Sequence, residues 1–95
     1  MDILFHVATE AGAQVLLPLA QACRRGGHAF GAFFTHEGVR GLLNADLQAA
    51  LHDCRAVVCE ESWHRFCGEA ACPVELGSQT VNSALMGEAK KVVSL

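Results

Sequence analysis

Three short apolar runs, each followed by polar residues and then by a helical pattern, constrain what this chain can fold into. They are Ile3–Ala8, His28–Phe34 and Arg55–Glu60, and a fourth apolar run, Val92–Val93, lies near the last residue of the sequence. Strands that alternate with helices form parallel sheets joined by right-handed crossovers. The sequence therefore predicts the α/β class: a three-layer, open, mostly parallel sheet of four to five strands with helices on both faces. Residues 1–95 are expected to form a single domain.

The connecting segments carry helix signals of different strength. Leu16, Leu19, Ala20 and Cys23 form one apolar helix face. The helical pattern runs from Ala13 to Arg25, and Thr9 before it resembles a cap residue. Proline is tolerated only near the first turn of a helix or at a kink, so Pro18 predicts that the regular helix begins close to Val15. The other expected elements are a helical turn over 39–43, a short helix capped by Asp46 that extends to Leu51, one helical turn over 62–67, an irregular stretch over 68–77, and a last helix over 79–89.

The length and net charge of the chain restrict the classes of function that it can have. The 95 residues are 52% hydrophobic, and a chain of this size buries roughly 60 to 65% of its unfolded surface. A small domain rich in Leu, Val and Ala is expected to hide apolar surface in a homo-oligomer. The net charge of −3 offers no basic footprint for a nucleic acid. Neither a signal peptide nor an apolar stretch long enough to cross a bilayer is recognisable, so we expect a cytoplasmic protein with no membrane association.

The five cysteines are the residues with the most chemistry. An odd number of cysteines in a cytoplasmic protein favours reduced thiols over a disulfide framework. Cys59 ends the third apolar run, which places its thiol at the carboxyl end of a parallel strand, where open α/β sheets bind their ligands. A helix that begins there would stabilise a thiolate through its free N–H groups, although Glu60 and Glu61 would oppose this if they faced the sulfur. The alternative is that Cys59 is a small buried hydrophobic residue.

Polar residues follow each of the three strands at the same predicted edge of the sheet. They are Thr9–Glu10, Thr35–Glu37 and Cys59–Ser62. We therefore predict Cys59 as the catalytic nucleophile, and the expected binding residues around it are Thr9, His36, Glu60 and Ser62.

A metal site is the competing interpretation of the cysteines. Zinc favours thiolates and imidazoles in close chelating pairs. Two residues separate His64 from Cys67 and four separate Cys67 from Cys72, but no paired CxxC occurs among these residues, Cys54 and Cys59. Gly26 and Gly27 lie between a helix and a strand, which is the wrong end for binding phosphate. We predict no metal and no cofactor, while a metal-binding role for His64, Cys67 and Cys72 stays open.

These features together resemble the DsrE/DsrF-like sulfur-relay family over nearly the whole chain. The pieces that carry the resemblance are the apolar first strand, the helix ending in Gly26–His28, the segment Phe33–Val39, the strand ending Val57–Cys59, and Ala89–Leu95. The resemblance implies a DsrE-like domain with flavodoxin-like topology. It also implies that Cys59 accepts sulfur as a persulfide from a donor protein and passes it to an acceptor protein.

Two other interpretations remain. The segment Glu60–Gly77 differs from the small-residue, basic helix that often follows the active cysteine, so the chain could be a non-catalytic subunit or a small-ligand-binding module with Cys59 merely packed. The region Pro18–His28 is also similar to the helix, Gly-His and strand that open the amino-terminal domain of some glycosyltransferases. The strand predicted at the end of the chain argues against that alternative.

Overall fold

The computed structural model describes residues 1–95, and its central feature is a sheet of five strands that all run parallel. The strands are β1 (Ile3–Val7), β2 (Phe30–Phe34), β3 (Arg55–Cys59), β4 (Glu75–Gly77) and β5 (Lys91–Ser94). Their spatial order is β4-β3-β2-β1-β5. The predicted α/β class is confirmed. The strand order is not the flavodoxin order, 2-1-3-4-5, because the chain moves one way from β1 to β4 and only then crosses back to the far edge.

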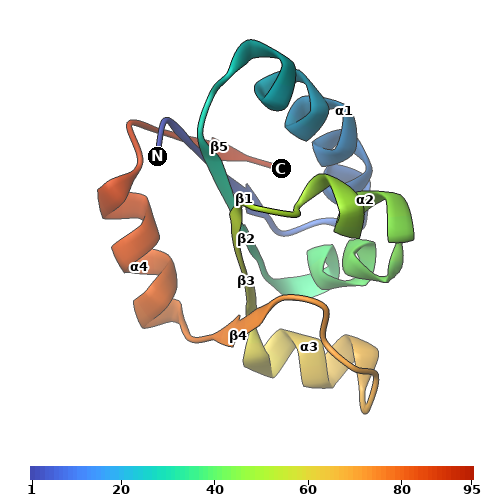
Figure 1. The fold of residues 1–95 in the computed structure, drawn as a ribbon. Coiled ribbons are helices and arrows are strands. Elements are labelled where there is room, and N and C mark those ends of the chain that lie inside the picture. Colours follow the sequence, from blue (N-terminus) through green and yellow to red (C-terminus); the bar gives the residue numbers. More distant parts are fainter.

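The helices form the two outer layers. They are α1 (Glu10–Gly26), the 3-10 helix η1 (His36–Leu43), α2 (Ala45–Ala50), α3 (Glu60–Cys67) and α4 (Gln79–Glu88). Figure 1 shows the sheet nearly edge-on, with α4 alone on its left and α1, α2 and α3 on its right. Right-handed crossovers explain this arrangement, since the reversal of direction after β4 puts the last crossover helix on the opposite face.

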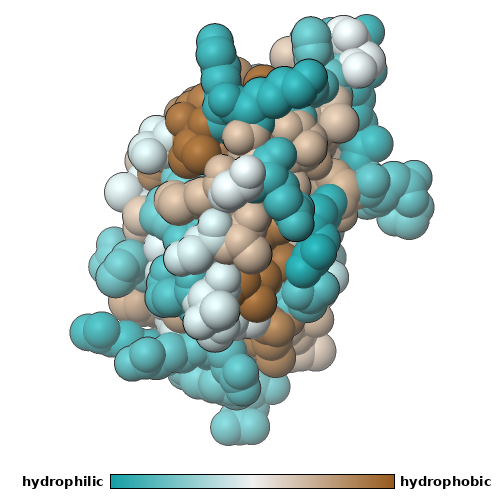
Figure 2. Space-filling view, turned by 90° about the vertical axis from the view of Figure 1, so that its left-hand side faces the viewer, coloured by the Kyte–Doolittle hydropathy of each residue, from teal (hydrophilic) through white to brown (hydrophobic).

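The sheet divides the hydrophobic core into two parts of unequal size. The larger part holds 16 buried residues, including Leu16, Phe34 and Trp63, and lies among the sheet, α1, η1, α2 and α3. The smaller part lies under α4 and consists of Leu4, Phe33, Val57, Cys59 and Leu85. Figure 2 shows the outer surface on the α4 side, where polar side chains separate several apolar areas. No helix of the protein is both long enough and apolar enough to span a membrane.

The first helix begins earlier than the sequence suggested. Thr9 is its N-cap, and the Thr9 hydroxyl accepts a hydrogen bond from Gly12 N–H at 2.8 Å. Pro18 therefore lies inside the helix and not in its first turn. The prediction of a start near Val15 was wrong because the capping hydrogen bond and the burial of the apolar face outweigh the cost of the proline.

Three other boundaries also differ from expectation. Asn44, not Asp46, caps α2: its Oδ1 accepts from the N–H groups of Asp46 at 2.8 Å and Leu47 at 3.1 Å. Helix α3 extends over two turns from Glu60 to Cys67, and the expected irregular stretch contains the short edge strand β4. That strand has three residues with little apolar alternation, so its sequence carries no strand signal.

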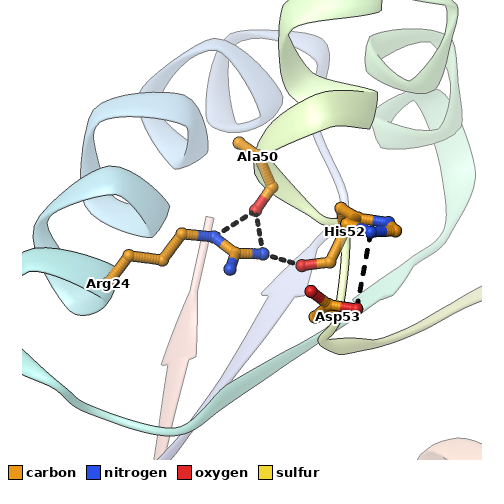
Figure 3. Close-up of polar contacts among 4 residues, drawn as sticks. All are labelled: Arg24, Ala50, His52 and Asp53. Atoms are coloured by element: carbon orange, nitrogen blue, oxygen red, sulfur yellow. Dashed lines mark hydrogen bonds and ion pairs between the residues drawn. The ribbon is translucent and has the colours of Figure 1, made fainter.

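Arg24 fixes the segment that leads into β3 (Figure 3). Its guanidinium donates to the Ala50 carbonyl oxygen from Nε at 3.0 Å and from Nη2 at 2.9 Å, and also to the carbonyl oxygen of His52. Nearby, His52 Nε2 lies 3.5 Å from Asp53 Oδ1, and both side chains are exposed. The carbonyls at the end of α2 have no partners within the helix, so Arg24 satisfies them and ties α1 to the approach of β3.

Candidate functional site

Cys59 is the last residue of β3 and the N-cap residue of α3. Its backbone is extended, with φ −61° and ψ 117°, and its side chain belongs to the small core under α4. The residue is 8% exposed. In the sheet it lies opposite Gly77 of β4, where a Cβ atom would come within 2.7 Å of Val57 Cγ1. The fold therefore places the sulfur at the carboxyl edge of the sheet and at the start of a helix, as predicted.

The first turn of α3 places hydrogen-bond donors near this sulfur. An N-cap side chain faces the N–H groups two and three residues ahead, which here belong to Glu61 and Ser62. The neutral thiol caps neither of them, because a thiol is a weak acceptor. Burial raises the pKa of Cys59, but the hydroxyl and N–H of Ser62, the hydroxyl of Thr35 and the N–H of Glu61 lower it by more. The net effect is a pKa below that of an ordinary cysteine.

Two buried hydroxyl groups complete the environment of the sulfur. Ser62 Oγ accepts a hydrogen bond from the backbone N–H of His36 at 2.9 Å, and it lies 3.4 Å from Thr35 Oγ1. Thr35 is 3% exposed and Ser62 8%. These contacts join the end of β2 to the first turn of α3, so two adjacent strand ends meet at Cys59. The predicted convergence of strand ends is seen here for β2 and β3.

The acidic residues beside Cys59 do not oppose its ionisation. Glu60 and Glu61 are both exposed, and Glu60 Oε1 lies 3.9 Å from His64 Nε2. No charged group is among the causes of the pKa shift at Cys59. Solvent screens the two carboxylates, so the hydrogen-bond donors determine the direction of the shift.

Three other cysteines have pKa values that change in the opposite direction. Burial raises the pKa of Cys54 to about 11, although Arg24 lowers it slightly. Burial also raises the pKa values of Cys67 and Cys72. At neutral pH the thiolate form is therefore favoured at Cys59 over these three residues.

The predicted binding residues divide into two groups. Ser62 and the backbone of His36 lie at the Cys59 site. Thr9 instead caps α1, and its hydroxyl donates to the carbonyl oxygen of Leu95 at 3.2 Å. Glu60 turns outward to His64. Thr9 and Glu60 therefore make structural contacts elsewhere and do not face the sulfur.

The alternative of a metal site gains no support from the geometry. No three side chains among His, Cys, Asp and Glu lie together in a way that could hold a metal ion. His64 is exposed on α3, while Cys67 and Cys72 are half-buried against the larger core.

Three polar residues near this part of the sheet were not among the predicted binding residues. Thr35 was placed at this edge from the sequence, but its hydroxyl was not predicted to take part in the site. Asn82 is buried on α4 between Val81 and Leu85, and its Oδ1 has no hydrogen-bond partner. His6 interrupts the apolar run of β1; it stacks on Phe33, with ring centroids 6.0 Å apart. Burial and then the neighbouring His36 lower the pKa of His6, which favours its neutral form.

Comparison with known proteins adds no assignment: no protein-family model matches the sequence, and no curated protein matches it either.

Proposed function

We propose that this protein is a sulfur carrier that holds sulfane sulfur as a persulfide on Cys59. The observation that supports this most is the set of donors around Cys59, which lowers the pKa of its thiol while burial raises the pKa values of Cys54, Cys67 and Cys72. A thiolate is the nucleophile in exchange at sulfur, and helix N-termini are places where proteins stabilise it.

The proposed reaction is a transfer between sulfur atoms that needs no external oxidant. The Cys59 thiolate attacks the outer sulfur of a donor persulfide, R–S–SH. A new S–S bond forms at Cys59, the S–S bond of the donor breaks, and the electron pair leaves with the donor as R–S⁻. Transfer onward is the same step with an acceptor thiolate attacking the outer sulfur of the Cys59 persulfide. The N–H and hydroxyl groups at the start of α3 stabilise the negative charge on sulfur before attack and after transfer.

Partners and family follow as parts of the same proposal. The donor and the acceptor would be proteins that carry cysteines, and the chain would belong to the DsrE/DsrF-like sulfur-relay proteins and act in the cytoplasm as a homo-oligomer. The parallel α/β sheet with a cysteine at the end of β3 supports this assignment.

An intact-mass measurement tests the proposal. Protein reduced and then incubated with a cysteine desulfurase and cysteine, or with polysulfide alone, should gain about 32 Da, the mass of one sulfur atom. Cys59→Ser should gain nothing, whereas Cys23→Ser should behave as wild type, because Cys23 is packed on the α1 face of the sheet. Equal labelling of wild type and Cys59→Ser would move the role to another cysteine.

One observation favours a second candidate, a non-catalytic subunit. The small exposed fraction of Cys59 is what a cysteine that merely packs in the core would show. That alternative predicts that neither wild type nor Cys59→Ser takes up sulfur, and that no cysteine alkylates rapidly at neutral pH.

A further inference from the structure

Ser62 is a buried polar residue whose contacts exceed what helix formation requires. It is the third residue of α3, and its hydroxyl lies inside the protein next to Thr35 and Cys59. Burying a hydroxyl costs free energy unless the group is hydrogen-bonded. Helix α3 would form equally well with alanine at this position, so local helix propensity does not account for the serine.

The neighbours of the Ser62 hydroxyl group indicate where its proton is directed. A serine hydroxyl has one proton to donate and two lone pairs that can accept. The N–H of His36 occupies one lone pair at 2.9 Å. Thr35 Oγ1 is 3.4 Å away, which is long for a hydrogen bond between two oxygens. Cys59 is the N-cap residue of the same helix and Ser62 is its third residue, which are the two positions whose side chains face each other across the first turn of a helix. The Ser62 hydroxyl comes first among the hydrogen-bonding groups that lower the pKa of Cys59.

The residue that orients Ser62 has an unusual backbone. His36 has a φ of +50°, a left-handed conformation that residues other than glycine rarely adopt. Such a conformation persists only where surrounding contacts hold it. The N–H of His36 points at Ser62 Oγ in this conformation. The turn after β2 is thereby linked through one side chain to the sulfur at the end of β3.

We propose that Ser62 is a positioning residue: the His36 N–H orients its hydroxyl so that the hydroxyl proton is directed at Cys59 Sγ and stabilises the thiolate. This inference deepens the proposed function and rests on it for the role of Cys59, but it concerns the acidity of the thiol and not the origin of the sulfur.

The charged groups near the site are few and face solvent. Glu60 and Glu61 on α3 and Glu37 on η1 are exposed, as is the imidazole of His36. On β4, Glu75 is exposed and pairs with Arg55 at 3.0 Å. The first turns of α4, from Gln79 to Asn82, contain no charged residue. A change in Cys59 acidity on altering Ser62 therefore reports the hydroxyl group.

The pH dependence of Cys59 alkylation tests the proposal. Cleavage at Arg55 and Arg65 releases a peptide whose only cysteine is Cys59, so iodoacetamide labelling of that peptide can be followed by mass spectrometry. Wild type, Ser62→Ala and Ser62→Thr are compared between pH 5 and pH 10. Ser78→Ala is the matched control, because Ser78 is at the N-cap position of α4 and its side chain makes no capping hydrogen bond.

We expect the midpoint of the pH profile to rise in Ser62→Ala, to return towards wild type in Ser62→Thr, and to stay unchanged in Ser78→Ala. Each unit of rise lowers the thiolate fraction at neutral pH about tenfold. The intrinsic reactivity of a more basic thiolate is about threefold higher, so the rate at neutral pH should fall about threefold per unit. An unchanged midpoint in a folded Ser62→Ala protein would overturn the proposal.

A measurement on the wild-type protein covers the case in which Ser62→Ala does not fold. The amide proton of His36 donates to Ser62 Oγ, so its NMR chemical shift should titrate with the same midpoint as Cys59 alkylation, and this titration should be lost in Cys59→Ser. A His36 amide shift that is independent of Cys59 contradicts the proposal. If the alkylation and NMR results are as expected while sulfur uptake fails, the positioning role stands and the proposed function falls.

Discussion

The buried polar side chains of this protein are Thr35, Ser62 and Asn82, and two of these three surround Cys59. Each buried polar group costs free energy unless its hydrogen bonds are made. Ser62 accepts a hydrogen bond from the N–H of His36, and Thr35 Oγ1 lies 3.4 Å from Ser62 Oγ. Both hydroxyl groups are among those that lower the pKa of Cys59. Polar groups are therefore concentrated where the proposed thiolate would form.

Cys54 provides a pH test of stability at the residue scale. Burial raises the pKa of its thiol from the ordinary value of a cysteine to about 11, so the folded state holds the proton more tightly than the unfolded chain. The contribution to stability is fully present below pH 9 and is lost as the pH rises through 11. We expect Cys54→Ala to remove this component of the alkaline loss of stability, as measured by urea denaturation at pH 8 and pH 10.5. If the free energy of unfolding fell by the same amount between pH 8 and pH 10.5 in wild type and in Cys54→Ala, the assignment to Cys54 would be wrong.

The candidate site was predictable from the sequence only where a residue's role follows from its place on a strand. Cys59 and Ser62 could be placed because β3 is a clear apolar run that ends in front of a helix. Thr9 and Glu60 occupy equivalent positions at strand ends, yet a cap and an exposed ion pair engage them instead. Strand position gives the edge of the sheet, but the direction of a side chain at that edge depends on packing that the sequence does not reveal.

At the scale of elements, close approach between helices depends on particular glycines. A Cβ atom at Gly41 of η1 would lie 2.2 Å from Cβ of Ala13 in α1. At Gly87 in α4, by contrast, a Cβ atom would meet nothing within 4 Å. The two glycines thus have opposite roles: one permits packing, and the other only weakens its helix.

Alanine substitutions at these two positions should change stability in opposite directions. Gly41→Ala should lower the free energy of unfolding by roughly 1 to 3 kcal/mol through overpacking. Gly87→Ala should raise it by roughly 0.5 to 1 kcal/mol, because alanine loses less backbone entropy in a helix. Thermal denaturation should detect both, since 1 kcal/mol corresponds to about 4 to 8 °C for a domain of this size. A destabilised Gly87→Ala would show that α4 does not tolerate a side chain there.

Four of the five strands and the helices between them could be predicted in order because apolar runs and helix periods alternate clearly, whereas β4 and the ends of the elements could not. The start of α1 was predicted too late because Pro18 was taken to lie near the first turn. Whether the Thr9 side chain caps the helix depends on the position of its hydroxyl in the folded protein, which the sequence does not show. β4 was missed because its exposed residues Glu75 and Leu76 pair with β3 at the sheet edge without an apolar pattern. The strand order depends on which edge receives β5, a long-range choice with no local signal.

For the whole molecule, the exposed surface bears on the expected homo-oligomer. The accessible area is 5180 Å², and a monomer of 10.1 kDa is expected to expose about 5,300 Å². The total area therefore does not demand a partner. Local features still favour association: Val92 and Met86 are exposed, and β4 and β5 are open edge strands.

We expect association to be weak and dependent on concentration. Light scattering over a range of protein concentrations should report a mass that rises above the 10.1 kDa of one chain. A constant mass of one chain at all concentrations, including the highest micromolar values, would contradict the oligomer.

The placement of β5 beside β1 has a consequence for the kinetics of folding. Ile3 pairs with Lys91, so this strand pair closes a loop of nearly the whole chain, whereas β1, β2 and β3 are joined by local crossovers. Non-local pairs form slowly because the entropy of loop closure is lost before their contacts are gained. We infer that β1 to β3 and α1 form the folding nucleus, and that α4 and β5 dock after the transition state.

Leu85→Ala and Leu16→Ala should separate these stages in stopped-flow experiments. Both side chains are buried: Leu85 packs between α4 and the sheet, and Leu16 packs between α1 and the sheet. Leu85→Ala should accelerate unfolding and leave refolding almost unchanged, whereas Leu16→Ala should slow refolding. Slower refolding in Leu85→Ala would place α4 in the nucleus. With late docking, the face of the sheet that carries Cys59 is the last to be covered in folding and the first to open in unfolding, so Cys59 would become accessible before the rest of the core is lost.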